Sequence, residues 1–308
     1  MNSSGIDLPL VSIIAINFNN SKYVIETLDS IDAQTYPNTE LIIVDDCSTD
    51  DSAQKIANWL IDYKKSFQFI RSPKNEGVCA TCNKGYEVAR GKYISYIATD
   101  DVMLPEKISR QVFFFGLLPD DTGMIYSDAY LIDDDGNELL GTFIQKFRNF
   151  DYAPSGNIFE TLIQGNFIPA MATMIKSSIF KTVGSFDESL LYEDFDMWLR
   201  IAKDYKIIFQ NEMTVKYRRR KNSLSSLGRS EKWINSEIKI LAKYQENDFV
   251  KKRITELILE LYINGYDYRE LYKKYKLLLT GKGITFKCMK MKIPTPIPKF
   301  FLKLFNRI

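Results

Sequence analysis

The sequence predicts an α/β fold in which helices cover both faces of a mostly parallel central sheet, with a helical extension at the C-terminus. Between residues 10 and 128, short β-branched apolar runs alternate with segments in which apolar residues recur every three or four positions. The runs are mostly apolar and do not alternate with polar residues, which is typical of strands buried on both faces. Strands and helices that alternate in this way form parallel sheets.

The first half of the chain contains five predicted strands and four predicted helices. In chain order the strands are residues 10–16, 41–44, 67–70, 93–98 and 124–126, and the helices are residues 21–33, 50–61, 78–89 and 105–118. Ser21 is expected to cap the first helix, and Thr49 or Asp50 the second, because their side-chain oxygens can accept from free amides of the first turn. Pro37 and Gly91 follow the ends of the first and third helices.

After Asp128 the pattern changes. Residues 129–132 and 138–143 flank Asp133-Asp134-Asp135-Gly136-Asn137, which predicts a hairpin. The three aspartates also suggest calcium, but the spacing lacks the other ligands of an EF-hand loop, so a turn is favoured. Further helices are expected at 158–164, at 193–204 and through most of 230–279.

These patterns predict three parts. Residues 1–226 would form the main domain, with a nucleotide-binding half at about 9–128 and an acceptor half at about 129–226. Residues 227–280 would form the helical extension, and residues 281–308 a basic amphipathic tail.

Composition indicates a folded intracellular protein. The 308 residues include 41 basic and 39 acidic side chains and no histidine. No apolar run is long enough to cross a bilayer, and no charged leader precedes Leu8, so we expect a cytoplasmic location. Four cysteines in a chain of this length make no disulfide framework. Cys79-Ala80-Thr81-Cys82 is interpreted as packing within a helix, with a redox role as the alternative.

The C-terminal residues carry a strong positive charge. From Leu271 onward there are ten basic residues and no acidic one, interleaved with apolar side chains. This pattern favours contact with the inner face of a cell membrane over a tail packed on the domain or used in self-association. No nucleic-acid-binding motif accompanies the charge, so nucleic acid is not an expected partner.

Polar residues follow three of the predicted strands. Ligands collect beyond the carboxyl ends of strands in an open parallel sheet. There Phe18 offers a ring for a nucleobase, Asp45 and Asp46 offer acceptors, and Asp100-Asp101 offers hard oxygens for Mg²⁺ or Mn²⁺. Helix capping is the alternative role for both carboxylate pairs. A third pair, Glu193-Asp194, opens an amphipathic helix, where the helix dipole alone would favour acids.

Six short motifs in this order resemble those of family 2 glycosyltransferases with the GT-A fold. The resemblance covers roughly residues 9 to 226. Its motifs are Val11-Ser12-Ile13-Ile14 through Asn19-Asn20, Val44-Asp45-Asp46-Cys47-Ser48-Thr49-Asp50, Asn75-Glu76-Gly77-Val78, Thr99-Asp100-Asp101, Val183-Gly184-Ser185-Phe186-Asp187-Glu188 and Glu193-Asp194-Phe195-Asp196. The resemblance implies non-processive transfer of a sugar from a nucleotide diphosphate, with UDP as the default, to a saccharide or lipid-linked acceptor, with inversion.

The resemblance also implies a role for individual residues. By position, the nucleoside pocket would be lined by Ile16, Phe18, Asp45 and Asp46, with Asn75 and Gly77 in the loop beside it. Asp101 and Asp100 would hold Mn²⁺ or Mg²⁺ on the diphosphate. Asp194 would be the general base, and Glu193 would lie close by. Arg220 stands where the family often has a histidine, and it would contact the diphosphate; an exposed basic loop is the alternative. Ala98 stands where another metal-site aspartate is common, so the acidic cluster of this chain has one carboxylate fewer.

Two other functions fit parts of the sequence. A sugar nucleotidyltransferase also pairs aspartates with a metal, but it would have a glycine-rich basic loop after the first strand, where this chain has Ala15-Ile16-Asn17-Phe18-Asn19. A catalytically silent nucleotide- or carbohydrate-binding module would explain Ala98 but not the intact Glu193-Asp194. Trp198 is expected to anchor its helix in the core, with sugar stacking as the alternative.

Overall fold

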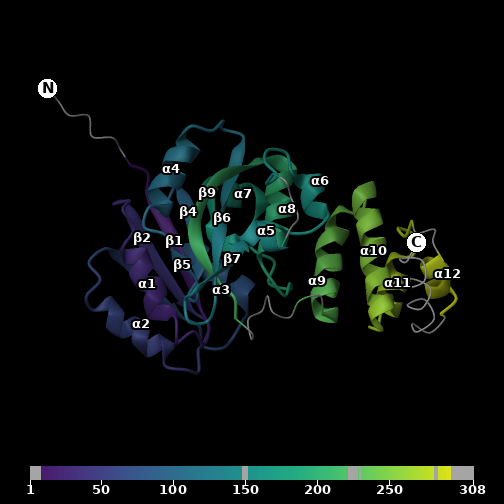
Figure 1. Cartoon of the computed structure of the whole chain (residues 1–308), viewed down its shortest axis with the longest axis horizontal. Helices are drawn as coiled ribbons and strands as arrows, with labels where there is room; N and C mark the ends of the chain where they lie inside the picture. The colour runs from purple at the N-terminus through teal and green to yellow at the C-terminus, as the bar shows by residue number, and fades with distance from the viewer. Residues whose placement is uncertain (1–7, 148–151, 221–227, 229, 281–283, 293–308) are drawn as a thin grey trace. The chain divides into compact units, whose positions relative to one another are not determined.

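The fold is described from a computed structural model, which describes residues 8–147, 152–220, 228, 230–280 and 284–292. The chain divides into two compact units, Met1–Ser223 and Leu224–Ile308. Figure 1 shows the strands of the first unit side by side, with helices around them, and the helices of the second unit.

The first unit is built on one mixed sheet. Within the described residues its strands run in the order β3-β2-β1-β4-β8-β6-β9-β5, with β7 paired to β6. The strands are β1 (Val11–Asn17), β2 (Thr39–Asp45), β3 (Ser66–Arg71), β4 (Tyr93–Ala98), β5 (Val102–Met103), β6 (Thr122–Ile132), β7 (Glu138–Thr142), β8 (Thr173–Lys176) and β9 (Lys206–Arg218). β1 pairs in parallel with β2 and β4, and β2 with β3, which confirms the predicted parallel sheet.

Helices cover both faces of this sheet. They are α1 (Val24–Asp32), α2 (Ser52–Leu60), α3 (Val78–Val88), α4 (Lys107–Gly116), α5 (Phe143–Phe147), α6 (Phe159–Ile163), α7 (Phe180–Val183) and α8 (Asp194–Asp204). Side chains alternate between faces along a strand. On β1, Ile13 joins the buried cluster that contains residues of α1 and α2, while Ile14 faces α3. A Cβ on Gly85 would lie 2.5 Å from Ile14 Cγ2, so glycine lets α3 approach the sheet closely.

The polar turn after β6 is a hairpin, as predicted. Asp133 N donates to Asn137 O at 3.0 Å, and the Asp133 carboxylate accepts from the amides of Asp135 and Asn137, each at 2.9 Å. Asp134 and Asp135 bond instead to Tyr23 and Lys22 at the start of α1. Backbone amides and side-chain donors from the same chain therefore use these carboxylates, which agrees with the turn and not with a calcium loop.

The two predicted helix caps have different outcomes. α1 begins at Val24 with Tyr23 at the N-cap, and α2 begins at Ser52 with Asp51 at the N-cap; neither cap side chain bonds to its helix. Ser21 N instead donates to Asp50 Oδ2 at 2.9 Å, which joins the starts of the two helices. Asp50 Oδ1 also accepts from Ser52 N at 3.0 Å, so the local bond predicted for Asp50 at the start of α2 is present, whereas the one predicted for Ser21 is not.

The second unit is helical in its described part, which confirms the predicted C-terminal helices. It contains α9 (Glu231–Leu241), α10 (Asp248–Asn264), α11 (Arg269–Tyr275) and α12 (Ile284–Lys290). Asn247 caps α10 by accepting from Phe249 N at 2.8 Å, and Gly265 ends it with a φ of 79°. A buried ion pair joins Glu237 of α9 to Arg253 of α10 at 2.8 Å.

No described helix is both long and apolar enough to cross a bilayer. Residues 281–283 and 293–308 of the predicted basic tail lie outside the described residues.

Candidate active site

The carboxyl ends of β1, β2 and β4 meet at one edge of the sheet, and Asn17 is the centre of the polar network there. Its amide Nδ2 donates to Asp45 Oδ1 at 2.6 Å and to the hydroxyls of Ser48 and Ser52, each at 3.0 Å. Its Oδ1 accepts from Thr99 Oγ1 at 2.6 Å. Asn17 is 2% exposed, so these bonds hold three strand ends together without competition from water.

Asp45 and Asp46 have different partners at this edge. Asp45 is fully buried and accepts from Asn17 and from both the amide and the hydroxyl of Ser48. Asp46 accepts from Glu76 N and Gly77 N, each at 2.9 Å. Neither carboxylate caps its own following helix. Asp46 instead fixes the loop that contains Asn75 and Gly77, which the sequence placed beside the nucleotide.

The other predicted nucleoside contacts are more open. The ring of Phe18 is 45% exposed, directly after the end of β1. Asn75 is exposed as well, and Ile16 is half-buried. Gly77 has a φ of +88° and no atom within 4 Å of an added Cβ, so its backbone conformation, and not crowding, requires glycine.

The carboxylates of Asp100 and Asp101 are both held by residues at the end of β9. Asp100 Oδ2 pairs with Arg220 NH1 at 2.7 Å. Asp101 Oδ1 accepts from Arg218 N at 2.8 Å, and Arg218 Nε donates to the Asp100 carbonyl. Burial, with the nearby charge of Asp100, raises the pKa of Asp101. The helix α4 has Glu106 at its N-cap, so neither aspartate caps it.

This aspartate pair offers a metal ion only part of a ligand set. Among the residues that the structure describes, no three Asp, Glu, His or Cys side chains gather in a group that could hold a metal. Asp101 Oδ2 makes no hydrogen bond within that described part, so the chain presents at least one hard oxygen ligand there. The residues therefore fit a divalent cation whose other ligands are diphosphate oxygens and water.

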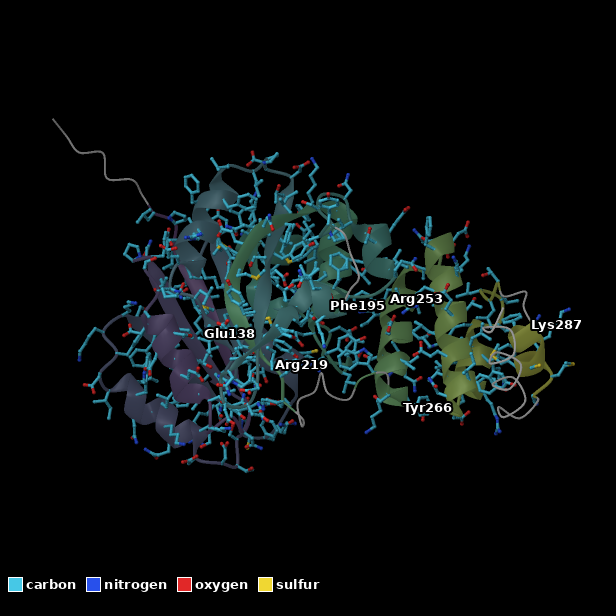
Figure 2. The ribbon with its side chains drawn as sticks, viewed as in Figure 1. Glu138, Phe195, Arg219, Arg253, Tyr266 and Lys287 are labelled. Atoms are coloured by element: carbon cyan, nitrogen blue, oxygen red, sulfur yellow. The ribbon has the colours of Figure 1, made fainter. Side chains whose placement is uncertain are left out.

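The third acidic pair lies at the start of α8. Asp194 is the first residue of the helix, next to Phe195, which is labelled in Figure 2. Its Oδ2 accepts from Asn166 Nδ2 at 2.6 Å and its Oδ1 from Phe195 N at 2.6 Å. Glu193 stands at the N-cap, and its side chain makes no capping bond.

The Glu193-Asp194 pair has an unusual protonation equilibrium. Burial raises the pKa of Asp194 to about 6, against the opposing bonds from Phe195 and Asn166. Burial and the charge of Asp194 raise the pKa of Glu193 to about 8. Around pH 7 the pair therefore carries about one proton, held mainly by Glu193, and Asp194 is the ionised member. A carboxylate with a pKa near 6 is well suited to accept a proton at neutral pH.

The thiols of Cys79 and Cys82 on α3 lie close enough to Glu193 to be affected by its charge. Burial raises the pKa of Cys79 to about 12 and that of Cys82 well above its usual value, and in both cases Glu193 adds to the effect. Thiols that remain protonated are poor nucleophiles, so packing is the better interpretation of this motif. Trp198 is fully buried in α8, which confirms its role as a core anchor.

Helix α3 connects the two carboxylate regions. Its N-cap, Gly77, bonds to Asp46 on the donor side. Asn83, in its second turn, donates to the Phe186 carbonyl at 3.0 Å and to Glu188 at 2.8 Å, in the loop that precedes Asp194. One rigid helix thus fixes both loops.

The sequence interpretation missed Asn17, Arg218 and Asn166 as site residues. Asn17 directly follows a buried strand, and its position at the strand end was an available signal. Arg218 ends a 13-residue strand that was not predicted at all. Asn166 lies in a loop 28 residues before its partner Asp194, and no local pattern relates the two.

The chain is similar to known proteins of one enzyme family. The model of the family described as Glycosyl transferase family 2 matches residues 12–183. An uncharacterized glycosyltransferase of Methanocaldococcus jannaschii is 33% identical over 226 residues, which are 72% of this chain and 75% of that protein. A putative teichuronic acid biosynthesis glycosyltransferase of Bacillus subtilis, TuaG, is 26% identical, over 71% of this chain and 82% of that protein.

Two solved structures share the fold. S. aureus TarS in complex with UDP-GlcNAc has a TM-score of 0.59 at 17% identity, covering 85% of this chain and 74% of that chain. The mannosyltransferase PcManGT from Pyrobaculum calidifontis, in complex with GDP-Man and Mn²⁺, has a TM-score of 0.59 at 16% identity, covering 78% and 65%.

Proposed function

Because this chain belongs to glycosyl transferase family 2, we propose that it moves one sugar per encounter from a nucleotide-diphosphate donor to an acceptor hydroxyl, with inversion. The observation that carries the proposal is Asp194, a carboxylate with two hydrogen bonds and a pKa of about 6. Inversion requires a base on the acceptor side and a stabilised leaving group on the opposite face of the sugar.

On the donor side, we assign the nucleoside to the region of Ile16, Phe18, Asp45 and Asp46 and the adjacent loop to Asn75 and Gly77. The exposed Phe18 ring can stack on the base. Asp46 contributes by fixing the loop amides, which leaves the loop in one conformation for the donor. UDP is the proposed nucleotide, and TarS, which shares the fold, was solved with UDP-GlcNAc.

At the diphosphate, Arg220 is the proposed cationic contact. Its guanidinium is already held beside Asp100 and over the ring of Tyr23, 5.0 Å from the centroid. Asp101 and Asp100 would hold Mn²⁺ or Mg²⁺, which supplies positive charge for the departing diphosphate when bound. The fold neighbour PcManGT was solved with Mn²⁺. Calorimetric titration of Mn²⁺ with and without UDP tests this assignment; equal affinity in Asp101→Asn and wild type would rule it out.

At the acceptor, Asp194 takes the proton of the attacking hydroxyl as the new glycosidic bond forms. At neutral pH Glu193 is the protonated neighbour, so it can orient an acceptor oxygen by donation but cannot compete as a base. A saccharide or lipid-linked saccharide is the proposed acceptor class, and the similarity to TuaG supports a role in polysaccharide biosynthesis.

The decisive test replaces Asp194 by Asn. Loss of a general base lowers the transfer rate about a hundredfold to ten-thousandfold, while donor affinity stays near that of wild type. The measurement is turnover with a panel of nucleotide sugars and acceptor extracts, beside calorimetric donor binding. The matched control is Asp204→Asn at the other end of α8. Wild-type turnover by Asp194→Asn would exclude Asp194 as the base.

The same measurements separate two other functions. Release of pyrophosphate from a nucleoside triphosphate and a sugar phosphate would identify a sugar nucleotidyltransferase. Nucleotide binding without turnover on any acceptor would identify a catalytically silent module.

We also propose that residues 1–226 act as the catalytic domain and that the basic C-terminal region attaches it to the inner face of the cell membrane. The exposed described lysines of this region are Lys273, Lys274, Lys276, Lys287, Lys290 and Lys292, and the exposed apolar side chains include Leu277 and Met291. Sedimentation with vesicles of anionic and of neutral lipid tests this, and equal binding to both would contradict it.

A further inference from the structure

The loop after α6 is anchored so that it presents Asn166 to the start of α8. Phe167 and Ile168, which follow Asn166, are each 1% exposed, and the Phe167 ring packs edge-on against Tyr126 of β6 at 6.1 Å. The helices α6 and α8 pack against each other. Core packing on one side of the loop therefore fixes the place of the polar residue on the other.

The side-chain amide of Asn166 is fixed in orientation as well as in place. Its Oδ1 accepts from Ile168 N at 3.1 Å, within its own loop. Its Nδ2, at the other end of the amide, donates to Asp194 Oδ2 at 2.6 Å. An amide turned the other way would set two acceptor oxygens against each other at Asp194 and two donors against each other at Ile168, so only one orientation satisfies both ends.

The two oxygens of Asp194 are held from different parts of the chain. Oδ1 takes its bond from Phe195 N, the next residue in the helix, and Oδ2 from Asn166 in the distant loop. A single bond from the helix would leave the carboxylate free to rotate about its side-chain torsion. The second bond selects one rotamer and leaves the remaining lone pairs for an acceptor hydroxyl.

We propose that Asn166 is a positioning residue for the acceptor-side base: it holds the Asp194 carboxylate in the orientation that receives the proton and favours its charged form. This inference rests on the proposed function for its catalytic meaning. The contact itself does not depend on which sugar or acceptor the enzyme uses. No pattern in the sequence assigns this residue a role.

One titratable group near Asp194, Glu193, changes charge close to the neutral range, so the test follows its signal together with that of Asp194. Glu193 lies beside it, with a pKa raised to about 8. From α3, Cys79 has a pKa of about 12 and Cys82 one well above its usual value, and burial also raises the pKa of Tyr96 on β4. Asp196, two residues further along the helix, is paired with Arg200 at 2.9 Å, and Asp187 lies in the preceding loop.

The isosteric change Asn166→Asp separates a positioning role from a purely structural one. The new carboxylate keeps an oxygen to accept from Ile168 N, so the loop keeps its internal bond. It loses the donor to Asp194 and sets a second carboxylate against it. The change Asn166→Ala removes both bonds without adding a charge.

The test is a pH titration of the side-chain carboxyl carbons by NMR in the full-length protein, with the signals assigned from Asp194→Asn and Glu193→Gln. Loss of one hydrogen bond to the charged form should raise the Asp194 titration by about 0.5 to 1 pH unit in Asn166→Ala. Two facing carboxylates should raise it by about 2 units or more in Asn166→Asp. The acid limb of the kcat/KM profile should move upward in the same order, with an unchanged donor KM.

A structural role alone predicts a different order. Asn166→Ala would then titrate like wild type and leave the acid limb of kcat/KM in place, whatever the added charge of Asn166→Asp does; that result, or three identical titrations, would overturn the proposal. Amide spectra show whether each variant is folded, and the isosteric variant keeps the test valid if the alanine variant is not. Because the titration needs no turnover, the Asn166 contact can fail while glycosyl transfer stands, and the reverse is equally visible.

Discussion

The two acidic regions of the first unit are built in opposite ways. At the donor edge, Asn17, Asp45, Ser48, Ser52 and Thr99 satisfy one another in a closed network that joins β1, β2 and β4. At the start of α8, Asp194 has one side-chain donor, and Glu193 has no capping bond. Asp45 is fully buried and the α8 pair is half-buried, but only the first region compensates its carboxylates fully.

This difference indicates separate physical tasks. A network with every donor and acceptor paired is rigid, and it can present a nucleotide pocket without reorganising. A buried carboxylate with few donors has a raised pKa and exchanges a proton near neutral pH. The donor edge therefore acts through geometry, and the α8 pair through its protonation.

Breaking the donor network should give the largest effect on stability. Asn17→Ala leaves Asp45, Thr99 and two serine hydroxyls short of partners inside the protein, so we expect the free energy of unfolding to fall by about 3 kcal/mol or more, with weaker donor binding. Urea denaturation measures this change. Asn58→Ala, on the exposed surface of α2, is the control and should change stability by less than about 0.5 kcal/mol. Equal effects in the two variants would show that the network is not cooperative.

Removing the cation beside Asp100 should have an intermediate effect, on binding. Arg220→Ala loses a charged contact to the donor, for which we expect about a tenfold to hundredfold weaker affinity for UDP by calorimetry. Arg219, the exposed neighbour labelled in Figure 2, provides the control Arg219→Ala. Similar losses in both variants would favour a diffuse basic loop over a specific diphosphate contact.

Neutralising the second acid of the α8 pair should have the smallest effect on turnover. Glu193 is protonated below about pH 8, and Gln resembles the protonated acid, so Glu193→Gln should change kcat by less than about threefold at pH 7. Rates of the two proteins should diverge above pH 8, where wild-type Glu193 ionises. A large loss at pH 7 would mean that Glu193 acts as an ionised group.

The pH dependence of stability tests the raised pKa of Glu193 independently of turnover. The pKa of Glu193 is raised in the folded state, so between about pH 5 and 8 the folded protein binds more protons than the unfolded chain. Its contribution to stability is present at low pH and is lost as pH rises to 8. The free energy of unfolding of wild type should therefore fall relative to Glu193→Gln across this range, as urea denaturation at several pH values will show.

Much of the fold follows from local patterns. The buried runs at β1, β2 and β4 are apolar on both faces, and only strands between two layers of helices need that composition. The hairpin at Asp133 follows from turn chemistry contained within five residues. The starts of helices were predicted less well. Ser21, the predicted cap of α1, donates its backbone amide to the Asp50 side chain before α2 and caps neither helix.

The candidate site shows the same difference between local features and long-range contacts. The positions of Asp45, Asp100 and Asp194 follow from the chain alone, because strand ends and helix starts are local features. Their hydrogen-bond partners do not, since Asn17 and Asn166 each lie 28 positions from Asp45 and Asp194, and Arg218, which donates to the Asp100 carbonyl, lies 118 positions from Asp100.

By itself, the sequence determined the α/β class, the family and the three acidic pairs, because each depends on residue type and short spacing. Only the tertiary structure decided which pairs are compensated and which remain able to titrate. Burial and hydrogen-bond partners set the pKa of a carboxyl group, and both come from parts of the chain that meet only when it folds.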